Sequence, residues 1–289
     1  MKKFISRIWI FFGVVSLLLL ANFLFNSYQL KKAPNLHGAK TIIIGDSRIM
    51  TAINPDLIPN SVNIAQNSES YIITYYKLKY LLRHNKGVER VILGFSYPSF
   101  SAYLDHIFKN DMATLDVLNR IYPIMSIRDF HGLEVDEQKY YQVLFKNLCA
   151  YPHTNHHQYM GGFVKLQPGI ERANLQSTIM RHYFDKDSNN IGISVCARQY
   201  LDSIITLTRD NHTELVLVNV PLHKDYLAKI PPNFIDYYNN AKDYYEQAGI
   251  KILDYSHIPL DNTYFKDYNH LSAEGADWVT QKIKEDLHL

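Results

Sequence analysis

Cysteine is scarce in this sequence, and so are several other signals that would point to a particular class of protein. Only two cysteines, Cys149 and Cys196, occur in 289 residues, and neither lies in a CxxC or another metal-type spacing. A disulfide between them stays open, because spacing alone cannot show whether they lie close enough to pair. The net charge is only +2, so the strong electrostatic field typical of nucleic-acid binding is absent. Without repeats or low-complexity tracts, the chain is expected to form one large domain that binds no nucleic acid.

One long apolar stretch occupies the N-terminus. Residues 8–25 are almost unbroken in hydrophobicity, and about 18 residues is near the lower limit for a membrane-spanning helix. Three basic residues precede the stretch and place the N-terminus in the cytoplasm, although Lys31 and Lys32 behind it weaken the asymmetry. No small-x-small cleavage site follows Leu20, because the next residues are mostly bulky. We predict an uncleaved anchor at 1–30 and a linker at 31–39, with a cleaved signal peptide as the main alternative and a buried core helix as a third. In both leading cases the remaining chain lies outside the cytoplasm.

From residue 40 onward, short apolar runs alternate with segments of helical periodicity. The expected strands are Thr41–Ile44, Ser61–Ala65, Val88–Phe95, Thr213–Val220 and Ile250–Tyr255. The expected helices are Tyr71–His84, Gln199–Arg209, Asn233–Gln247 and Ser272–Leu287. Strands separated by helices predict an α/β fold with a parallel sheet and helices on both faces. Residues 99–192 break this rhythm and predict an insertion of loops and helices, the latter around Met112–Leu118 and Glu137–Leu148.

A Gly45-Asp46-Ser47 turn follows the first expected strand. Ligands of open parallel sheets bind beyond the carboxyl ends of the strands, which is where Ser47 would lie. Gly45 permits a tight turn, and the backbone N–H groups that open the next helix could stabilise an oxyanion. The alternative is that Asp46 and Ser47 only cap that helix.

A second short motif, Asp267-x-x-His270, lies between the last expected strand and the terminal helix. This spacing lets a carboxylate accept a hydrogen bond from the imidazole Nδ1–H, which leaves Nε2 free as a base. The alternative is that His270 is one of 13 histidines and lies on the surface. Because both motifs follow strands at the same edge of the sheet, we expect Ser47, His270 and Asp267 to form one catalytic site.

Gly45-Asp46-Ser47 and Asp267-x-x-His270 together resemble the first and last sequence blocks of the SGNH (GDSL-type) hydrolase superfamily. The resemblance covers residues 40–289 apart from the insertion. It implies a three-layer, flavodoxin-like, doubly wound fold, a Ser-His-Asp triad, no cofactor and no metal.

More narrowly, Gly-Asp-Ser-Arg, then Ala52-Ile53-Asn54-Pro55 and Val62-Asn63-Ile64-Ala65, resembles a membrane-anchored bacterial subgroup associated with surface polysaccharides. That likeness implies a single-pass protein of the inner membrane with a periplasmic C-terminal domain. Its expected substrate is an acylated glycan, and a membrane-bound O-acyltransferase is an expected partner.

The sequence departs from the superfamily at the oxyanion hole. Asn67 and Ser68 stand near the place of the usual glycine, and Gly94-Phe95-Ser96-Tyr97 replaces the usual Gly-x-Asn-Asp block. Ser68, Asn67 and Ser96 are therefore the candidate oxyanion or substrate-binding residues. Losing one oxyanion donor typically lowers the rate about 100–1000-fold.

A few further residues have two readings each. Arg48 is either a binding residue for an anionic or sugar group or an exposed helix arginine. His153, His156 and His157 resemble metal ligands in composition, but without a partnering acidic residue or cysteine at defined spacing a solvated loop is the expectation. His223 follows a strand and is a candidate to line the cleft.

Three functions are compatible with these features. The leading hypothesis is a tethered serine esterase or O-acyltransferase acting on acyl, most plausibly O-acetyl, esters of an envelope glycan. The second is a non-catalytic carbohydrate-binding or scaffold protein of polysaccharide assembly that has an impaired oxyanion hole. The third is a phospholipid or thioester hydrolase, which needs an apolar acyl slot.

Overall fold

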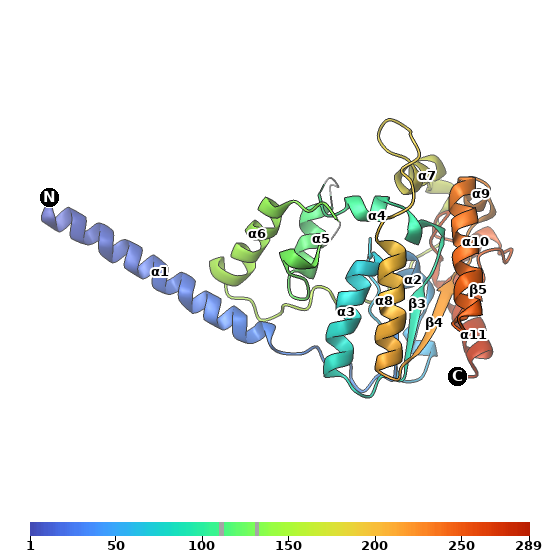
Figure 1. Cartoon of the computed structure of the whole chain (residues 1–289), viewed down its shortest axis with the longest axis horizontal. Helices are drawn as coiled ribbons and strands as arrows, with labels where there is room; N and C mark the ends of the chain where they lie inside the picture. Colours follow the sequence, from blue (N-terminus) through green and yellow to red (C-terminus); the bar gives the residue numbers. More distant parts are fainter. Residues whose placement is uncertain (110–112, 131–132) are drawn as a thin grey trace.

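Five short strands form one parallel sheet at the centre of the computed structural model, which describes residues 1–109, 113–130 and 133–289 (Figure 1). The order is β2-β1-β3-β4-β5, the flavodoxin-like arrangement, which confirms the predicted fold class. The strands are β1 (Thr41–Ile44), β2 (Ser61–Asn63), β3 (Arg90–Gly94), β4 (Glu214–Asn219) and β5 (Lys251–Asp254). From β1 the chain adds β2 on one side of the sheet and then β3, β4 and β5 on the other, so a crevice is expected between β1 and β3 at their carboxyl ends.

Both faces of the sheet are covered by helices, because alternate side chains of each strand point to opposite sides. In β1, Ile42 and Ile44 join a core with α3 (Tyr71–His84), α8 (Ala197–Asp210) and α10 (Pro232–Gln247). Ile43, between them, joins a second core with α2 (Ser47–Ala52) and α11 (Ala273–Leu287). These two cores and the sheet make the three layers.

The chain between β3 and α8 adds a helical segment at the side of this sheet (Figure 1). Its helices are α4 (Tyr103–His106), α5 (Thr114–Ile121), α6 (Glu137–Phe145), the π-helix η4 (Lys146–Ala150) and α7 (Leu175–Tyr183). The expected helix at Met112–Leu118 corresponds to α5, although Met112 lies outside the described residues. The expected helix at Glu137–Leu148 corresponds to α6 and η4, whereas α7 was not predicted.

The remaining described helices are short. They are η1 (Pro55–Leu57), η2 (Tyr97–Phe100), η3 (Ile127–Asp129), η5 (Ile170–Arg172), α9 (Lys224–Leu227) and η6 (Asn262–Tyr264). Several of them, notably η2, α9 and η6, lie in the loops that follow strands and so shape the edge of the sheet where the site is expected. The two cysteines are both free thiols, so no disulfide joins Cys149 to Cys196.

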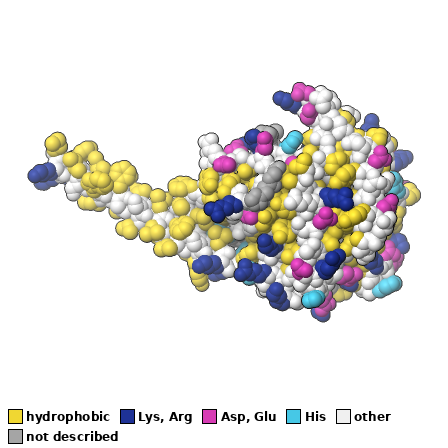
Figure 2. Space-filling model, in the orientation of Figure 1, with side chains coloured by type: hydrophobic (Ala, Val, Ile, Leu, Met, Phe, Trp, Pro, Cys, Tyr) yellow, Lys and Arg dark blue, Asp and Glu magenta, His cyan; other side chains and the backbone are white. Residues whose placement is uncertain are grey.

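Helix α1 (Lys2–Leu30) projects away from the rest of the chain and is covered by hydrophobic side chains (Figures 1 and 2). It is the one helix in the described part of the chain that is long and apolar enough to cross a membrane. Its length and composition fit either a membrane anchor or a signal sequence.

Candidate active site

Ser47 is the first residue of α2 and lies just past the carboxyl end of β1. Asp46 caps this helix: its backbone is extended, and its carboxylate accepts a hydrogen bond from Arg48 N at 3.0 Å. Asp46 thus caps the helix, while the half-buried Ser47 stays available for chemistry. The first N–H groups of a helix have no intrahelical acceptor, so the Ser47 amide can serve as a donor at this site.

The sharp turn before Ser47 depends on Gly45. Its φ of +147° belongs to a region that side-chain-bearing residues rarely adopt. A Cβ on Gly45 would also lie 2.9 Å from Ile49 Cγ1 and 3.2 Å from Gly94 N, at the end of the neighbouring strand β3. The two glycines let the ends of β1 and β3 approach each other, with Ile49 filling the space between them.

Helix α2 has only six residues, and Asn63 at the end of β2 holds it in place. Its Nδ2 donates to Ile49 O at 3.1 Å and to Ile53 O at 2.8 Å, which satisfies carbonyl groups at the end of the helix. Its Oδ1 accepts from Ala65 N at 3.0 Å. The asparagine of the Val-Asn-Ile-Ala segment thus positions the helix that carries Ser47, a role the sequence analysis did not recognise.

The structure brings Ser47, His270 and Asp267 together. Ser47 Oγ lies 2.8 Å from His270 Nε2, although 223 positions separate the two residues. His270 Nδ1 lies 3.0 Å from Asp267 Oδ1 and 2.9 Å from Asp267 Oδ2. Because a carboxylate only accepts hydrogen bonds when ionised, Nδ1 carries the proton and Nε2 is free to accept from the serine hydroxyl. This is the geometry of a serine nucleophile with its general base and orienting carboxylate.

Two backbone N–H groups hold the Asp267 carboxylate in place. Asp267 Oδ1 accepts from Asn269 N and His270 N, each at 2.9 Å. Burial alone would raise the pKa of Asp267, but the hydrogen bond and electrostatic interaction with His270 and the two backbone donors outweigh it and lower the pKa below its ordinary value. The carboxylate therefore stays ionised and holds the imidazole tautomer.

The expectation of an exposed helix arginine is wrong for Arg48, whereas its role as a binding residue stays a prediction. Its side chain is 3% exposed, and it forms a buried ion pair with Asp46, in which Nε donates to Asp46 Oδ1 at 3.2 Å. Burial opposes the charge, but the neighbouring carboxylate outweighs it and raises the pKa of Arg48. In this structure Arg48 neutralises the capping Asp46 beneath the turn.

His182, at the end of α7, reaches the same region and was missed by the sequence analysis. It is buried, and its Nδ1 lies 2.6 Å from the hydroxyl of Tyr226. The positive charges of Arg48 and Arg181 act on it. Burial first, and the positive charges of Arg48 and Arg181 second, lower the pKa of His182 well below its ordinary value, so it is neutral at neutral pH. The helical segment between β3 and α8 thus places a neutral, hydrogen-bonded histidine near the Gly45–Ser47 turn.

The candidate oxyanion residues occupy mixed positions. Asn67 is exposed, and its carbonyl accepts from Arg120 Nη1 at 3.0 Å. Ser68 has a left-handed backbone with a φ of +54°. Ser96 is buried, and its hydroxyl is 2.8 Å from that of Ser99. In the described part of the chain, no hydrogen bond connects these three residues to Ser47, so their role stays a prediction.

A cavity of about 710 Å³ lies beside the loop that carries Asp267 and His270. His223 lines it, and the backbone N–H of His223 donates to Tyr268 O within that loop at 3.3 Å. The other lining residues are Leu222, Lys224, Leu227, His257, Ile258, Pro259, Leu260, Asp261 and Asn262. Neither Ser47 nor His270 lines it, so the cavity adjoins the triad without containing it.

The solvated-loop prediction for the histidines at 153–157 is wrong for His156. That side chain is 1% exposed and is hydrogen-bonded to the hydroxyl of Tyr122. Burial and the neighbouring histidines lower the pKa of His156. Within residues 1–109, 113–130 and 133–289, no group of three or more His, Cys, Asp or Glu side chains could hold a metal ion.

Comparisons with family models and with curated proteins found no match. Among solved structures, the chain is similar to a protein from Bacteroides thetaiotaomicron described as a GDSL-like lipase, at 12% identity and a TM-score of 0.40, over 93% of this chain and 98% of that one. It is also similar to a candidate acylhydrolase from Bacteroides fragilis, at 12% identity and a TM-score of 0.41, over 91% and 94% of the two chains.

A third similar structure is a candidate lipolytic protein of the G-D-S-L family from Desulfitobacterium hafniense, at 11% identity and a TM-score of 0.41, over 85% of this chain and 98% of that one. Two of these names contain the same GDSL label as the superfamily that the Ser47 and His270 motifs resemble. Because the identities and TM-scores are low, the chemistry of the site follows from the atoms of the triad and not from these likenesses.

Proposed function

We propose that this protein is a membrane-tethered serine esterase or O-acyltransferase that acts outside the cytoplasm on acyl esters of a cell-envelope glycan. The observation that carries the chemistry is the contact of 2.8 Å between Ser47 Oγ and His270 Nε2, with Asp267 on the other ring nitrogen. The glycan and its location are supported by the resemblance to the polysaccharide-associated subgroup and by the apolar helix α1.

The reaction begins with Ser47. Its Oγ attacks the acyl carbonyl while His270 Nε2 takes the proton, and the Ser47 N–H stabilises the tetrahedral oxyanion. His270 then returns the proton to the leaving alcohol, which leaves the acyl group on Ser47. Water releases it in an esterase, and a sugar hydroxyl takes it in a transferase. In the transferase case, a membrane-bound O-acyltransferase that delivers acyl groups across the bilayer is the proposed partner.

A fluorophosphonate probe tests the nucleophile directly, because it reacts with an activated serine. We expect the wild-type protein to be labelled, and labelling to be lost in Ser47→Ala and strongly reduced in His270→Ala. Ser203→Ala is a control, since the hydroxyl of Ser203 on α8 donates to Gln199 O at 2.8 Å and lies outside the triad. Labelling that persists in Ser47→Ala would refute the proposal.

One observation favours the non-catalytic alternative. The Ser96 hydroxyl, at the place of the usual oxyanion asparagine, is engaged with Ser99, and Asn67 is exposed. If the wild-type protein is not labelled while it binds a glycan equally well with and without Ser47→Ala, the protein is a binding or scaffold component instead.

A further inference from the structure

The C-terminal end of α1 is part of the folded domain. Asn22 and Asn26 lie one turn apart on this helix and both face η4. Asn22 Nδ2 donates to Cys149 O at 2.9 Å and to Ala150 O at 3.2 Å. Asn26 Nδ2 donates to Leu148 O at 3.0 Å and to Tyr151 O at 2.7 Å. We call these two asparagines, with the four carbonyl groups they bind, the asparagine clamp.

The clamp meets a need created by η4. The last carbonyl groups of a helix have no partner within it, and here the two asparagine side chains supply the missing donors. Asn26 is completely buried, and its Oδ1 also accepts from His153 N at 2.7 Å, so its amide is bonded on both sides. A cut after any of residues 22–25 would remove Asn22 and leave the carbonyl groups of Cys149 and Ala150 without this donor. A cut after residue 20 or 21 would leave both asparagines in place. The clamp therefore favours a retained anchor over a signal peptide cleaved after residues 22–25.

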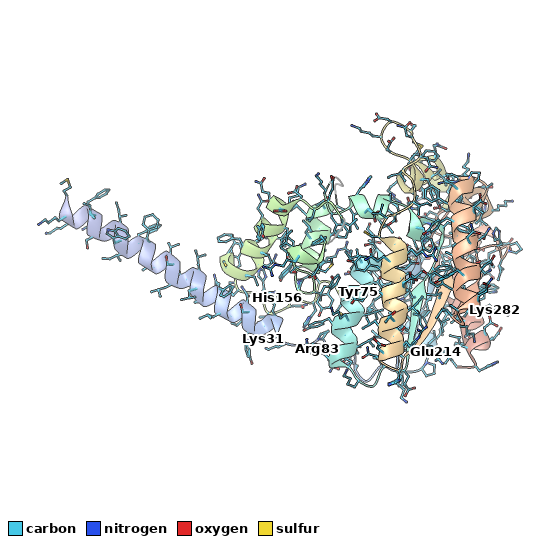
Figure 3. All side chains as sticks on the ribbon, viewed as in Figure 1. Lys31, Tyr75, Arg83, His156, Glu214 and Lys282 are labelled. Carbon is cyan, nitrogen blue, oxygen red and sulfur yellow. The ribbon has the colours of Figure 1, made fainter. Side chains whose placement is uncertain are left out.

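The clamp also sets where the domain starts along α1. Residues 4–21, ahead of Asn22, span about 27 Å at 1.5 Å per residue, close to the thickness of about 30 Å of a bilayer core. Among the elements that the structure describes, none lies beside this part of the helix, and its side chains extend outward (Figure 3). The sequence alone placed the membrane span at residues 8–25, but Asn22 and Asn26 bind the domain, so the span moves towards the N-terminus.

Exposed aromatic side chains gather where the free part of α1 begins. Tyr141 and Phe145 lie one turn apart on α6 and are 53% and 55% exposed, and Tyr151, after η4, is 61% exposed. Figure 1 shows α6 as the edge of the domain nearest to the free part of α1, and Figure 2 shows that the hydrophobic surface of α1 reaches this edge. Lys146 is exposed next to Phe145, and Glu137 is exposed at the start of α6. Elsewhere in the described domain, exposed large hydrophobic side chains are scattered: Leu115, Val164, Val195, Tyr244 and Leu289.

We propose that Tyr141, Phe145 and Tyr151 rest in the headgroup region of the same bilayer that α1 spans. Aromatic side chains favour this interface, and Lys146 suits anionic headgroups. The occupant is lipid because the aromatic surface continues directly from an apolar helix of membrane length. The clamp then makes the tether rigid, so the Ser47 site is held at a fixed height and its substrate must come close to the membrane. This inference rests on α1 as a membrane anchor and is independent of the chemistry at Ser47.

Depth-dependent quenching in lipid nanodiscs tests the proposal with the full chain. In a Cys149→Ala/Cys196→Ala background, a fluorophore is attached at Phe145→Cys or, as the control, at Tyr244→Cys. Tyr244 is an aromatic residue of α10 with a similar exposure of 51%. The nanodiscs contain phosphatidylcholine and phosphatidylglycerol, with a nitroxide near the headgroup of some lipids. We expect the fluorophore at 145 to lose most of its emission and the one at 244 to be unaffected.

A second variant tests the clamp. Asn22→Ala/Asn26→Ala should reduce the quenching at 145 while α1 stays inserted, and thermal unfolding checks that the domain still folds. Equal emission at 145 and 244 in the unaltered clamp background would overturn the proposal. If 145 is protected only in native membranes, the surface binds a membrane protein, and the lipid proposal fails. Fluorophosphonate labelling of Ser47 is read in parallel, so failure of the membrane proposal is separated from failure of the enzymatic one.

Discussion

Replacing Asp267 with asparagine tests the proposed mechanism more sharply than removing the serine. The substitution preserves the size of the side chain and removes only its charge and its ability to accept at both oxygens. The remaining oxygen can still accept from Asn269 N and His270 N, which now lie 2.9 Å from Asp267 Oδ1. The loop should therefore keep its shape while the group facing the imidazole becomes a donor.

The expected loss follows from the tautomer. When an NH₂ group faces His270 Nδ1, this nitrogen must accept a hydrogen bond, so the imidazole proton moves to His270 Nε2. Nε2 then cannot accept from Ser47 Oγ, which lies 2.8 Å away. In a serine triad, this exchange lowers kcat about 10⁴-fold. Each factor of ten corresponds to about 1.36 kcal/mol, so the transition state loses about 5 kcal/mol of stabilisation.

The assay is the hydrolysis of p-nitrophenyl acetate by the full chain in detergent, together with the rate of fluorophosphonate labelling. Asp243→Asn is the matched control, because Asp243 is an exposed aspartate of α10. Thermal unfolding shows whether the Asp267→Asn variant is folded. A folded variant whose kcat/KM stays within about tenfold of the wild type would refute the role of Asp267 as the orienting carboxylate.

Three further predictions concern stability and the nucleophile turn. Because the pKa of Asp267 is lowered below its ordinary 3.8, its ionised carboxylate stabilises the folded protein fully above pH 3.8, and this stabilisation should disappear as the pH falls through the lowered pKa. The measurement is the difference in Tm between the wild type and Asp267→Asn as a function of pH. A difference that grows in acid would contradict the prediction. Lys77 Nζ lies 2.6 Å from Glu69 Oε2 in a buried ion pair, so Lys77→Met should lower the free energy of unfolding in denaturant by about 3–5 kcal/mol. Glu69→Gln/Lys77→Met should regain much of this stability, because no unpaired charge stays buried. A double variant whose loss equals the sum of the two single losses would contradict the prediction. Gly45→Ala should destabilise the protein by about 1–3 kcal/mol and abolish fluorophosphonate labelling of Ser47. Gly87→Ala is the control and should do neither, because a Cβ added there has no atom within 4 Å. Equal effects of the two substitutions would contradict the importance of the turn at Gly45.

The sequence by itself determined the features that depend on local order along the chain. The apolar runs and helical spacings predicted the alternating α/β pattern because hydrophobic periodicity reflects which face of each element is buried. Ser47 and His270 could be paired without coordinates, since each follows a strand and the carboxyl ends of parallel strands meet at one edge. The long apolar helix at the N-terminus could also be predicted, because its apolar residues are contiguous in the sequence.

The tertiary structure alone decided how charged and polar side chains are used, because their partners come from distant parts of the chain or from unforeseen burial. Arg48 was expected either to bind an anionic or sugar group or to be exposed on a helix, yet it pairs with Asp46 inside the protein. Asn63 reaches Ile49 O and Ile53 O only when β2 lies beside α2. Asn26 and Leu148 are 122 positions apart, and no sequence pattern links a membrane helix to the end of η4. A buried polar group must find a partner wherever the folded chain provides one, and that choice belongs to three-dimensional packing, which local sequence order does not encode.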